Sequence, residues 1–348
     1  VAGSVVAWVG VFTALLAASI ALVNTDIKRV LAYSTVSQLG YMFIGVGVGA
    51  YTAGIFHLFT HAFFKGLMFL AAGSVMHAMA DQLDMRKMGG LLSKMKITGV
   101  TFWIGALAIA GIPPLSGFWS KDEILVSAYR SGHVGIWVLG MIGAGMTAFY
   151  MFRLIFMTFH GKPRDQELHD HAHESPTSMT VPLIVLAAGS VLVGFVGFPP
   201  GHGWIDGFLK DAAGHAGAAH DATEGLSGGV LMALSVLAGV VGIAIAYRMH
   251  KAGTLGVVSA KTLYRTLENK WYVDEIYRAL IVKPIHRLSV GLWEIFDTII
   301  IDGIANGLAY LVKGVSWVST RFQTGAAPTY ALWMAVGVVV MVSLMLTP

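Results

Sequence analysis

The chain has 348 residues, of which 56% are apolar and only 12% are charged. Soluble domains carry about 25% charged residues, and the mean hydropathy here is +0.70. These values exclude a disordered chain, a coiled coil and a typical cytosolic enzyme, and they indicate a polytopic membrane protein. The net charge of +4 is too small to indicate a nucleic-acid-binding protein. Without cysteine, the chain has no disulfide, thiolate-ligated zinc or cysteine-ligated iron–sulfur cluster.

Long apolar runs follow one another along the chain. In lipid the backbone must satisfy its own hydrogen bonds, so runs of about 20 apolar residues predict helices. The chain opens at Val1 inside such a run, and we expect it to be the carboxyl-terminal part of a longer protein. We predict an all-α membrane helix bundle with about eight spans, of which the fourth is broken at Pro113–Pro114. In chain order the spans are 1–23, 30–49, 53–79, 98–127, 134–158, 181–199, 228–247 and 328–347.

Basic residues are distributed unequally between the two sides of such a bundle. Alternate loops hold 13 Lys and Arg on one side and 2 on the other. The positive-inside rule places the basic set in the cytoplasm. The basic loops are 24–29, 80–97, 160–180 and 248–270, and the others are 49–52, 128–133 and 199–227.

Residues 270–321 have polar side chains at helical spacing with apolar side chains between them. This pattern predicts a long amphipathic helix on the cytoplasmic side, kinked at Pro284. Fifty residues reach roughly 75 Å, more than twice the bilayer core of about 30 Å. The helix is therefore expected to run along the membrane, and two short interfacial helices are the alternative.

His57, His61 and Lys65 recur every four residues in HLFTHAFFKGLMFL, which places them on one helix face near mid-membrane. A lysine at that depth costs about 2.5–3.5 kcal/mol, so it should face the bundle interior or water. Burial favours the neutral form of a lysine, and histidine titrates near neutral pH. The row suggests a proton relay. The alternative is a structural lysine paired with a carboxylate, beside histidines that satisfy backbone groups.

GIPPLSGFWSKDEI, residues 111–124, places two prolines inside an apolar span. Helix breaks of this kind mark ion sites in transporters. Lys121 and Asp122 follow within two turns and could exchange counter-ions, although a simple kink with interfacial anchors is the alternative. In residues 26–43, Ser34 and Gln38 could support a water chain leading in from Lys28, or serve helix packing alone.

Two weaker patterns point to structure rather than chemistry. The glycines at 45, 47 and 49 lie inside an apolar span and predict a packing face rather than a nucleotide loop. His160, His169, His171 and His173 share a loop with acidic residues, where a solvated loop is favoured over a metal site.

Five segments closely resemble the antiporter-like, proton-translocating membrane subunits of NADH:quinone oxidoreductase, respiratory complex I. They are NTDIKRVLAYSTVSQLGYMF, HLFTHAFFKGLMFLAAGSV, KMGGL, GIPPLSGFWSKDEIL and MTAFYMFRLIFMTFHGK. The tail that begins NKWYVDEIYRALIVKP is similar to that of the subunit L branch. Subunits M and N resemble the core but lack such a tail.

The resemblance implies a domain plan. Residues 1–159 look like the second of two five-helix repeats, and the first repeat is absent from this sequence. Two further transmembrane helices with loops follow in 160–248. The lateral helix, 249–321, would contact neighbouring subunits M and N, and residues 322–348 would form a membrane anchor.

The resemblance also implies roles. Lys65 matches the family's central lysine, His57 and His61 the histidines before it, and Lys121 with Asp122 the charged pair near proton exit. Protons would then pass from the histidines through Lys65 to that pair. The entry path through Lys28, Ser34 and Gln38 is a hypothesis from the residues alone.

On this reading the chain is a subunit of a redox enzyme and carries no cofactor itself. NADH, FMN, iron–sulfur clusters and quinone would lie in partner subunits. The expected location is the bacterial inner membrane, with lipids as further contacts, or alternatively the mitochondrial inner membrane. The rival functions are the large subunit of a multi-subunit Na⁺/H⁺ antiporter or membrane-bound hydrogenase, and a non-conducting membrane scaffold.

Overall fold

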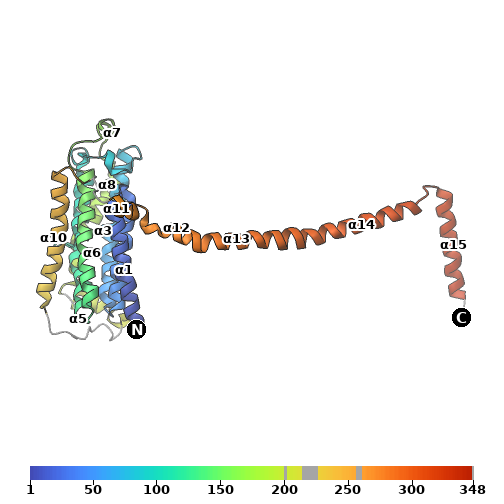
Figure 1. The fold of residues 1–348 in the computed structure, drawn as a ribbon, viewed down its shortest axis with the longest axis horizontal. Helices are drawn as coiled ribbons and strands as arrows, with labels where there is room; N and C mark the ends of the chain where they lie inside the picture. Colours follow the sequence, from blue (N-terminus) through green and yellow to red (C-terminus); the bar gives the residue numbers. More distant parts are fainter. Residues whose placement is uncertain (200–201, 214–225, 256–260, 347–348) are drawn as a thin grey trace. The chain divides into compact units, whose positions relative to one another are not determined.

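The computed structural model describes residues 1–199, 202–213, 226–255 and 261–346 (Figure 1). The predicted loops 199–227 and 248–270 therefore lie partly outside the described residues. The chain divides into two compact units, Val1–Trp271 and Tyr272–Pro348. The described part contains helices and no β-strand beyond an isolated bridge between Asp26 and Asp84. The predicted all-α class is confirmed.

The first unit is a bundle of long helices that run side by side (Figure 1). Six of its membrane-spanning elements are continuous enough to cross a bilayer by length and composition. They are α1 (Ala2–Val23), α2 (Ile27–Gly47), α3 (Tyr51–Ala78), α6 (Val134–Thr158), α8 (Thr177–Leu192) with its 3-10 extension η3 (Val193–Gly197), and α10 (Gly228–Lys251). The shorter elements are η1 (Met85–Lys87), η2 (Leu91–Ser93), α7 (Gln166–His171), α9 (Trp204–Ala213) and α11 (Lys261–Glu268).

The predicted fourth span is two helices of 15 residues each, α4 (Lys96–Ala110) and α5 (Ser116–Arg130). Gly111 closes α4 in the left-handed region, with φ of +77°, which glycine adopts without a steric penalty. Prolines 113 and 114 then supply no backbone N–H to continue the helix. The broken helix predicted from the prolines is confirmed.

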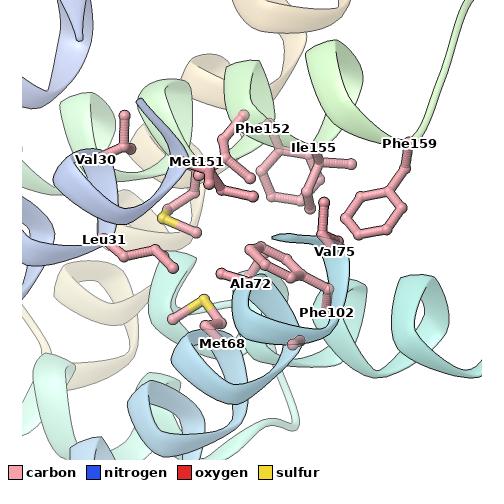
Figure 2. Packing of buried hydrophobic residues seen from close by; sticks show 14 of the residues in the cluster. Val30, Leu31, Met68, Ala72, Val75, Phe102, Met151, Phe152, Ile155 and Phe159 are labelled. Carbon is pink, nitrogen blue, oxygen red and sulfur yellow. The ribbon is translucent and has the colours of Figure 1, made fainter. Parts of the chain in front are cut away.

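The apolar core of the bundle lies where α2, α3, α4 and α6 meet. Figure 2 shows Leu31, Met68, Phe102 and Met151 turned toward one another from these four helices. All four side chains are fully buried. This core fixes the helices around the polar side chains that they carry toward the interior.

The end of the bundle that holds the basic loops is joined by hydrogen bonds to main-chain carbonyls. The amide of Ile27 donates to the carbonyl of Leu83 at 3.0 Å. Arg164 donates to three main-chain carbonyls, those of Met85, Met88 and Met157. These bonds fix the loops around the ends of α2 and α6.

The second unit begins with one long helix. Helical backbone continues from Val273 to Phe322 through α12 (Val273–Tyr277), the π segment η6 (Arg278–Val282), α13 (Lys283–Leu292), the π segment η7 (Trp293–Ile301) and α14 (Asp302–Phe322). A second helix, α15 (Ala327–Leu346), follows. The segment Lys270–Phe322, which contains helix 273–322, is long and apolar enough to cross a membrane by length and composition, and so is α15. The eight candidates in the described chain thus include this helix in place of the broken one.

The helix in which a kink was predicted at Pro284 continues past this proline without a break. The wider π turn η6 directly precedes this proline and keeps helical dihedrals on both sides. A π turn changes which carbonyl faces the proline ring, so the ring need not break the helix. The backbone instead leaves the right-handed region at Lys270, Trp271 and Tyr272, whose φ values are +54°, +59° and +56°.

Candidate functional site

Three titratable side chains lie along the buried face of α3. His57, His61 and Lys65 are only 1%, 6% and 4% exposed. Lys65 lies near the middle of the helix, and its ammonium donates to the main-chain carbonyl of Leu31 in α2 at 2.9 Å. No carboxylate lies within 4.0 Å of it among the residues that the structure describes. The lysine can therefore lose its proton without leaving a buried carboxylate unpaired.

The hydrogen-bond partner of Lys65 is a main-chain carbonyl and not a carboxylate. A lysine paired with a carboxylate would be a structural ion pair. Instead the Leu31 carbonyl also accepts a hydrogen bond from the Thr35 hydroxyl at 3.0 Å. A carbonyl dipole stabilises an ammonium less than a full negative charge would.

His57 connects three helices. Its Nε2 lies 3.0 Å from Oε1 of Gln38 in α2, and its Nδ1 lies 2.8 Å from the hydroxyl of Ser120 in α5. The amide oxygen only accepts, so Nε2 carries the proton and Nδ1 of the neutral ring accepts from Ser120. Ser120 also lies 2.7 Å from the hydroxyl of Thr60. These groups can pass a proton by exchanging donor and acceptor roles.

His61 lies between His57 and Lys65 without a hydrogen bond to either in the described chain. The two imidazole centroids are 6.2 Å apart. The predicted row therefore shares one buried face, but it does not form a continuous hydrogen-bonded chain through protein atoms alone.

Lys121 and Asp122 are each 1% exposed on α5, and they point to different helices. The Lys121 ammonium lies 5.0 Å from the ring centroid of Tyr41 in α2. The Asp122 carboxylate accepts a hydrogen bond from Ser235 in α10. Successive helix residues are rotated by about 100°, which explains the divergence. The two groups therefore do not form a direct ion pair here.

The predicted uptake residues are only partly brought together. Ser34 and Gln38 are fully buried on α2, and Ser34 accepts from the hydroxyl of Tyr150 at 3.0 Å. Lys28 is half-buried at the start of α2. No hydrogen bond or ion pair joins Lys28 to Ser34 or Gln38 among the described residues.

Sequence reasoning missed the hydroxyl groups that join these helices. Ser120 precedes Lys121 in a motif already singled out, and Thr60 follows His57 by one turn. Those positions could have been found from their neighbours. Ser235 is an isolated hydroxyl in an apolar stretch, which no spacing in the sequence distinguishes, whereas Tyr150 lies three residues after Thr147 and three before Arg153.

Several buried polar atoms have no protein partner among the described residues. Buried polar groups in folded proteins are almost always hydrogen-bonded, often to internal water. Their positions between the α2, α3 and α5 groups suit a hydrated interior path. They are Ser37 Oγ, Gln38 Nε2, His61 Nε2, Lys121 Nζ and Asp122 Oδ2.

The weaker sequence patterns fall outside this site. A Cβ atom at Gly47 would overlap the backbone of Ala7, which confirms a packing face. In the histidine-containing loop, Glu174 accepts from the amide of Ile97 at 2.7 Å and from the hydroxyl of Thr98 at 2.6 Å at the start of α4. No group of three metal-binding side chains comes together within the described residues.

Known proteins resemble this chain in sequence and in fold. A family model described as NADH:quinone oxidoreductase/Mrp antiporter, TM, matches residues 1–147. NAD(P)H-quinone oxidoreductase chain 5 of a Picosynechococcus species is 43% identical, over 94% of this chain and 54% of that protein. NADH-quinone oxidoreductase subunit L of Rickettsia bellii is 42% identical, over 96% of this chain and 53% of that protein. The chain is thus similar to antiporter-like subunits over nearly its whole length.

The chain spans about half the length of the curated family relatives that it matches. A solved Mrp complex from Dietzia sp. DQ12-45-1b matches the fold with a TM-score of 0.53. Its sequence is 23% identical, and the match covers 86% of this chain and 33% of that one. The antiporter-like fold is thus supported by the family model and by a solved structure, and the chain is a multi-pass membrane protein.

Proposed function

We propose that this chain is part of the proton-translocating subunit L of an NADH:quinone oxidoreductase. The observation that carries the proposal is the buried Lys65 ammonium, held by the carbonyl of Leu31 rather than by a carboxylate. A group in this setting can bind and release a proton in the middle of the membrane. The names of the relatives in Picosynechococcus and Rickettsia support the assignment to that enzyme.

The proposed proton path uses the hydrogen-bonded groups around α3. Gln38, His57 and Ser120 form a polar bridge from α2 to α5. Lys65 stores the proton, and His57 and His61 exchange protons with it through internal water. Lys121 and Asp122 on α5 receive the proton and pass it toward the less basic side. Lys28 and Ser34 complete the uptake side in this proposal.

A charge change in a neighbouring subunit would drive the cycle. A positive charge that approaches Lys65 disfavours its ammonium form, because like charges repel strongly in a medium of low dielectric constant. We assign the redox chemistry, with its NADH, FMN, iron–sulfur clusters and quinone, to partner subunits. The proposed location is the bacterial inner membrane.

The test is Lys65→Ala in the full-length protein within its complex. We expect NADH-driven proton pumping by membrane vesicles to fall more than about tenfold, a typical loss for removal of a proton-transfer group. The exposed Lys94 lies in a basic loop, and Lys94→Ala should leave pumping unchanged. Normal pumping by an intact Lys65→Ala complex would support the scaffold alternative instead.

The Na⁺/H⁺ antiporter alternative shares the fold of the Mrp complex. The two functions differ in the subunits and redox centres that should co-purify with the protein. Purification of the full-length protein from its native membrane should recover flavin absorbance and iron–sulfur signals together with NADH oxidation. Sodium-driven proton exchange without those centres would favour the antiporter.

We further propose that helix 273–322 lies against other membrane subunits, the neighbouring M and N subunits. Its apolar side chains, such as Leu288 at 64% and Ile299 at 67%, are exposed in this chain. A long helix with uncovered apolar side chains requires either lipid or protein contacts. Its length of roughly 75 Å would allow it to contact more than one neighbour.

A further inference from the structure

A cavity of about 520 Å³ lies between α4, α6 and α10, away from the polar site described above. Its apolar part includes Leu107 of α4 and Ile243 of α10, within the spans. Its polar part includes His160, His250 and Lys251, at the end of the bundle that carries the basic loops. The cavity is therefore apolar toward the membrane and basic toward one surface.

Aromatic rings form the walls between these two parts. The Phe156 ring stacks on His250 with the centroids 5.1 Å apart and the planes inclined by 20°. Trp103 meets Phe152 edge-on, with centroids 5.2 Å apart. Tryptophan and tyrosine are typical of the level where lipid headgroups meet the hydrocarbon core. Tyr247 and Trp103 give the cavity that character.

His160 is set up as a hydrogen-bond donor. The indole N–H of Trp103 donates to its Nε2 at 3.1 Å, so the neutral imidazole carries its proton on Nδ1. Burial and the adjacent His250 lower the pKa of His160, which agrees with a neutral ring. His160 therefore offers an N–H group rather than a second full charge.

Lys251 supplies the full positive charge, and its ammonium lies 5.6 Å from the ring centroid of Tyr247. No carboxylate lies within 4.0 Å of Lys251, His250 or His160 in the part of the chain that the structure describes. Arg248 adds another basic side chain in the last turn of α10. The basic end of the cavity thus carries positive charge that no described carboxylate within 4.0 Å offsets.

We propose that this cavity binds a phospholipid with an anionic headgroup. The phosphate lies near Lys251 and the Nδ1–H of His160, and an acyl chain lies against Leu107 and Ile243. An uncharged amphipathic molecule would use the apolar part but not the lysine. A zwitterionic headgroup would bring its own ammonium group toward Lys251, at an electrostatic cost. The site is independent of the proposed proton path.

The experiment uses the full-length protein in its intact complex, reconstituted into nanodiscs. A phosphatidylglycerol with a photoreactive acyl chain is irradiated, and mass spectrometry maps the labelled residues. We expect labelling on α4, α6 and α10 near Leu107 and Ile243. Excess unlabelled phosphatidylglycerol should suppress this labelling, and excess phosphatidylcholine should not. Equal suppression by both lipids would overturn the proposal, and this comparison requires no variant.

Lys251→Gln provides the second measurement. Removal of one cation at the headgroup level should weaken labelling about fivefold. Lys94→Gln removes the same charge from an exposed position in a basic loop outside the cavity and should have no effect. Unchanged labelling of an intact Lys251→Gln complex would also overturn the proposal.

Discussion

The hydroxyl of Ser120 is the residue-scale link between α3 and α5. It lies within hydrogen-bond distance of His57, of Thr60 and of the Ser116 carbonyl, which is 3.3 Å away, and its single proton is donated to one acceptor at a time. A hydroxyl can donate to one neighbour while it accepts from another, which suits proton exchange. Ser120 therefore connects His57 to the helix that carries Lys121.

Ser120→Ala should reduce proton pumping about threefold to tenfold without loss of the complex. The change leaves Nδ1 of His57 without its partner, at a cost of about 1–3 kcal/mol for a buried polar group. NADH-driven acidification of vesicles measures the effect.

Ser190→Ala is the matched control. Ser190 is equally buried, but it donates to the carbonyl of Leu186 within its own helix, outside the site. If both variants pump like the parent, the bridge through Ser120 has no part in conduction.

At the scale of elements, the break between α4 and α5 positions the charged residues. α5 restarts at Ser116 and packs back against the end of α4. At Gly117 a Cβ atom would overlap the carbonyl of Ala108. The missing side chain therefore permits the close approach that brings Lys121 and Asp122 into the bundle.

Gly117→Ala should destabilise the protein by about 1–3 kcal/mol, the usual cost of overpacking, because the obstructing atoms are backbone and cannot rotate away. Gly73→Ala in α3 is the control, since no atom lies within 4 Å of the added carbon. Thermal unfolding of the purified complex, followed through this subunit, measures the difference. Equal stability of the two variants would show that the α4–α5 contact relaxes freely.

At the scale of the whole molecule, helix 273–322 has little to pack against within its own unit. Almost all of its described side chains are exposed. Among them, Ile295 and Ile299 repeat at helical spacing and belong to an apolar row. Glu294 and Asp302 lie in a separate row at the same spacing, with Thr298 between them. A lysine can therefore be placed in the apolar row at Ile299 or in the polar row at Thr298, and the two variants together test the proposed contact with other subunits.

Ile299→Lys should weaken retention of the neighbouring membrane subunits during purification about tenfold, because a charge buried without a partner in such a contact is costly. Thr298→Lys introduces the same charge between two carboxylates, where it is favourable on a helix surface. Quantitative mass spectrometry of the co-purified subunits gives the readout. Similar loss with both variants, or with neither, would contradict an apolar contact through Ile299.

The sequence by itself determined the membrane class, the broken helix and the buried titratable residues. These are local properties: a run of apolar residues, two prolines, or a lysine within a span can each be judged without knowledge of its neighbours in space. The same local reasoning gave no sign of the π turn that precedes Pro284.

Only the tertiary structure decided which groups meet. Lys65 binds a carbonyl 34 residues away, His57 a serine 63 residues away, and Asp122 a serine 113 residues away. Such partners depend on the rotation and depth of each helix in the bundle, which are set by packing of the shared core. For that reason Lys121 and Asp122, neighbours in the sequence, serve different helices.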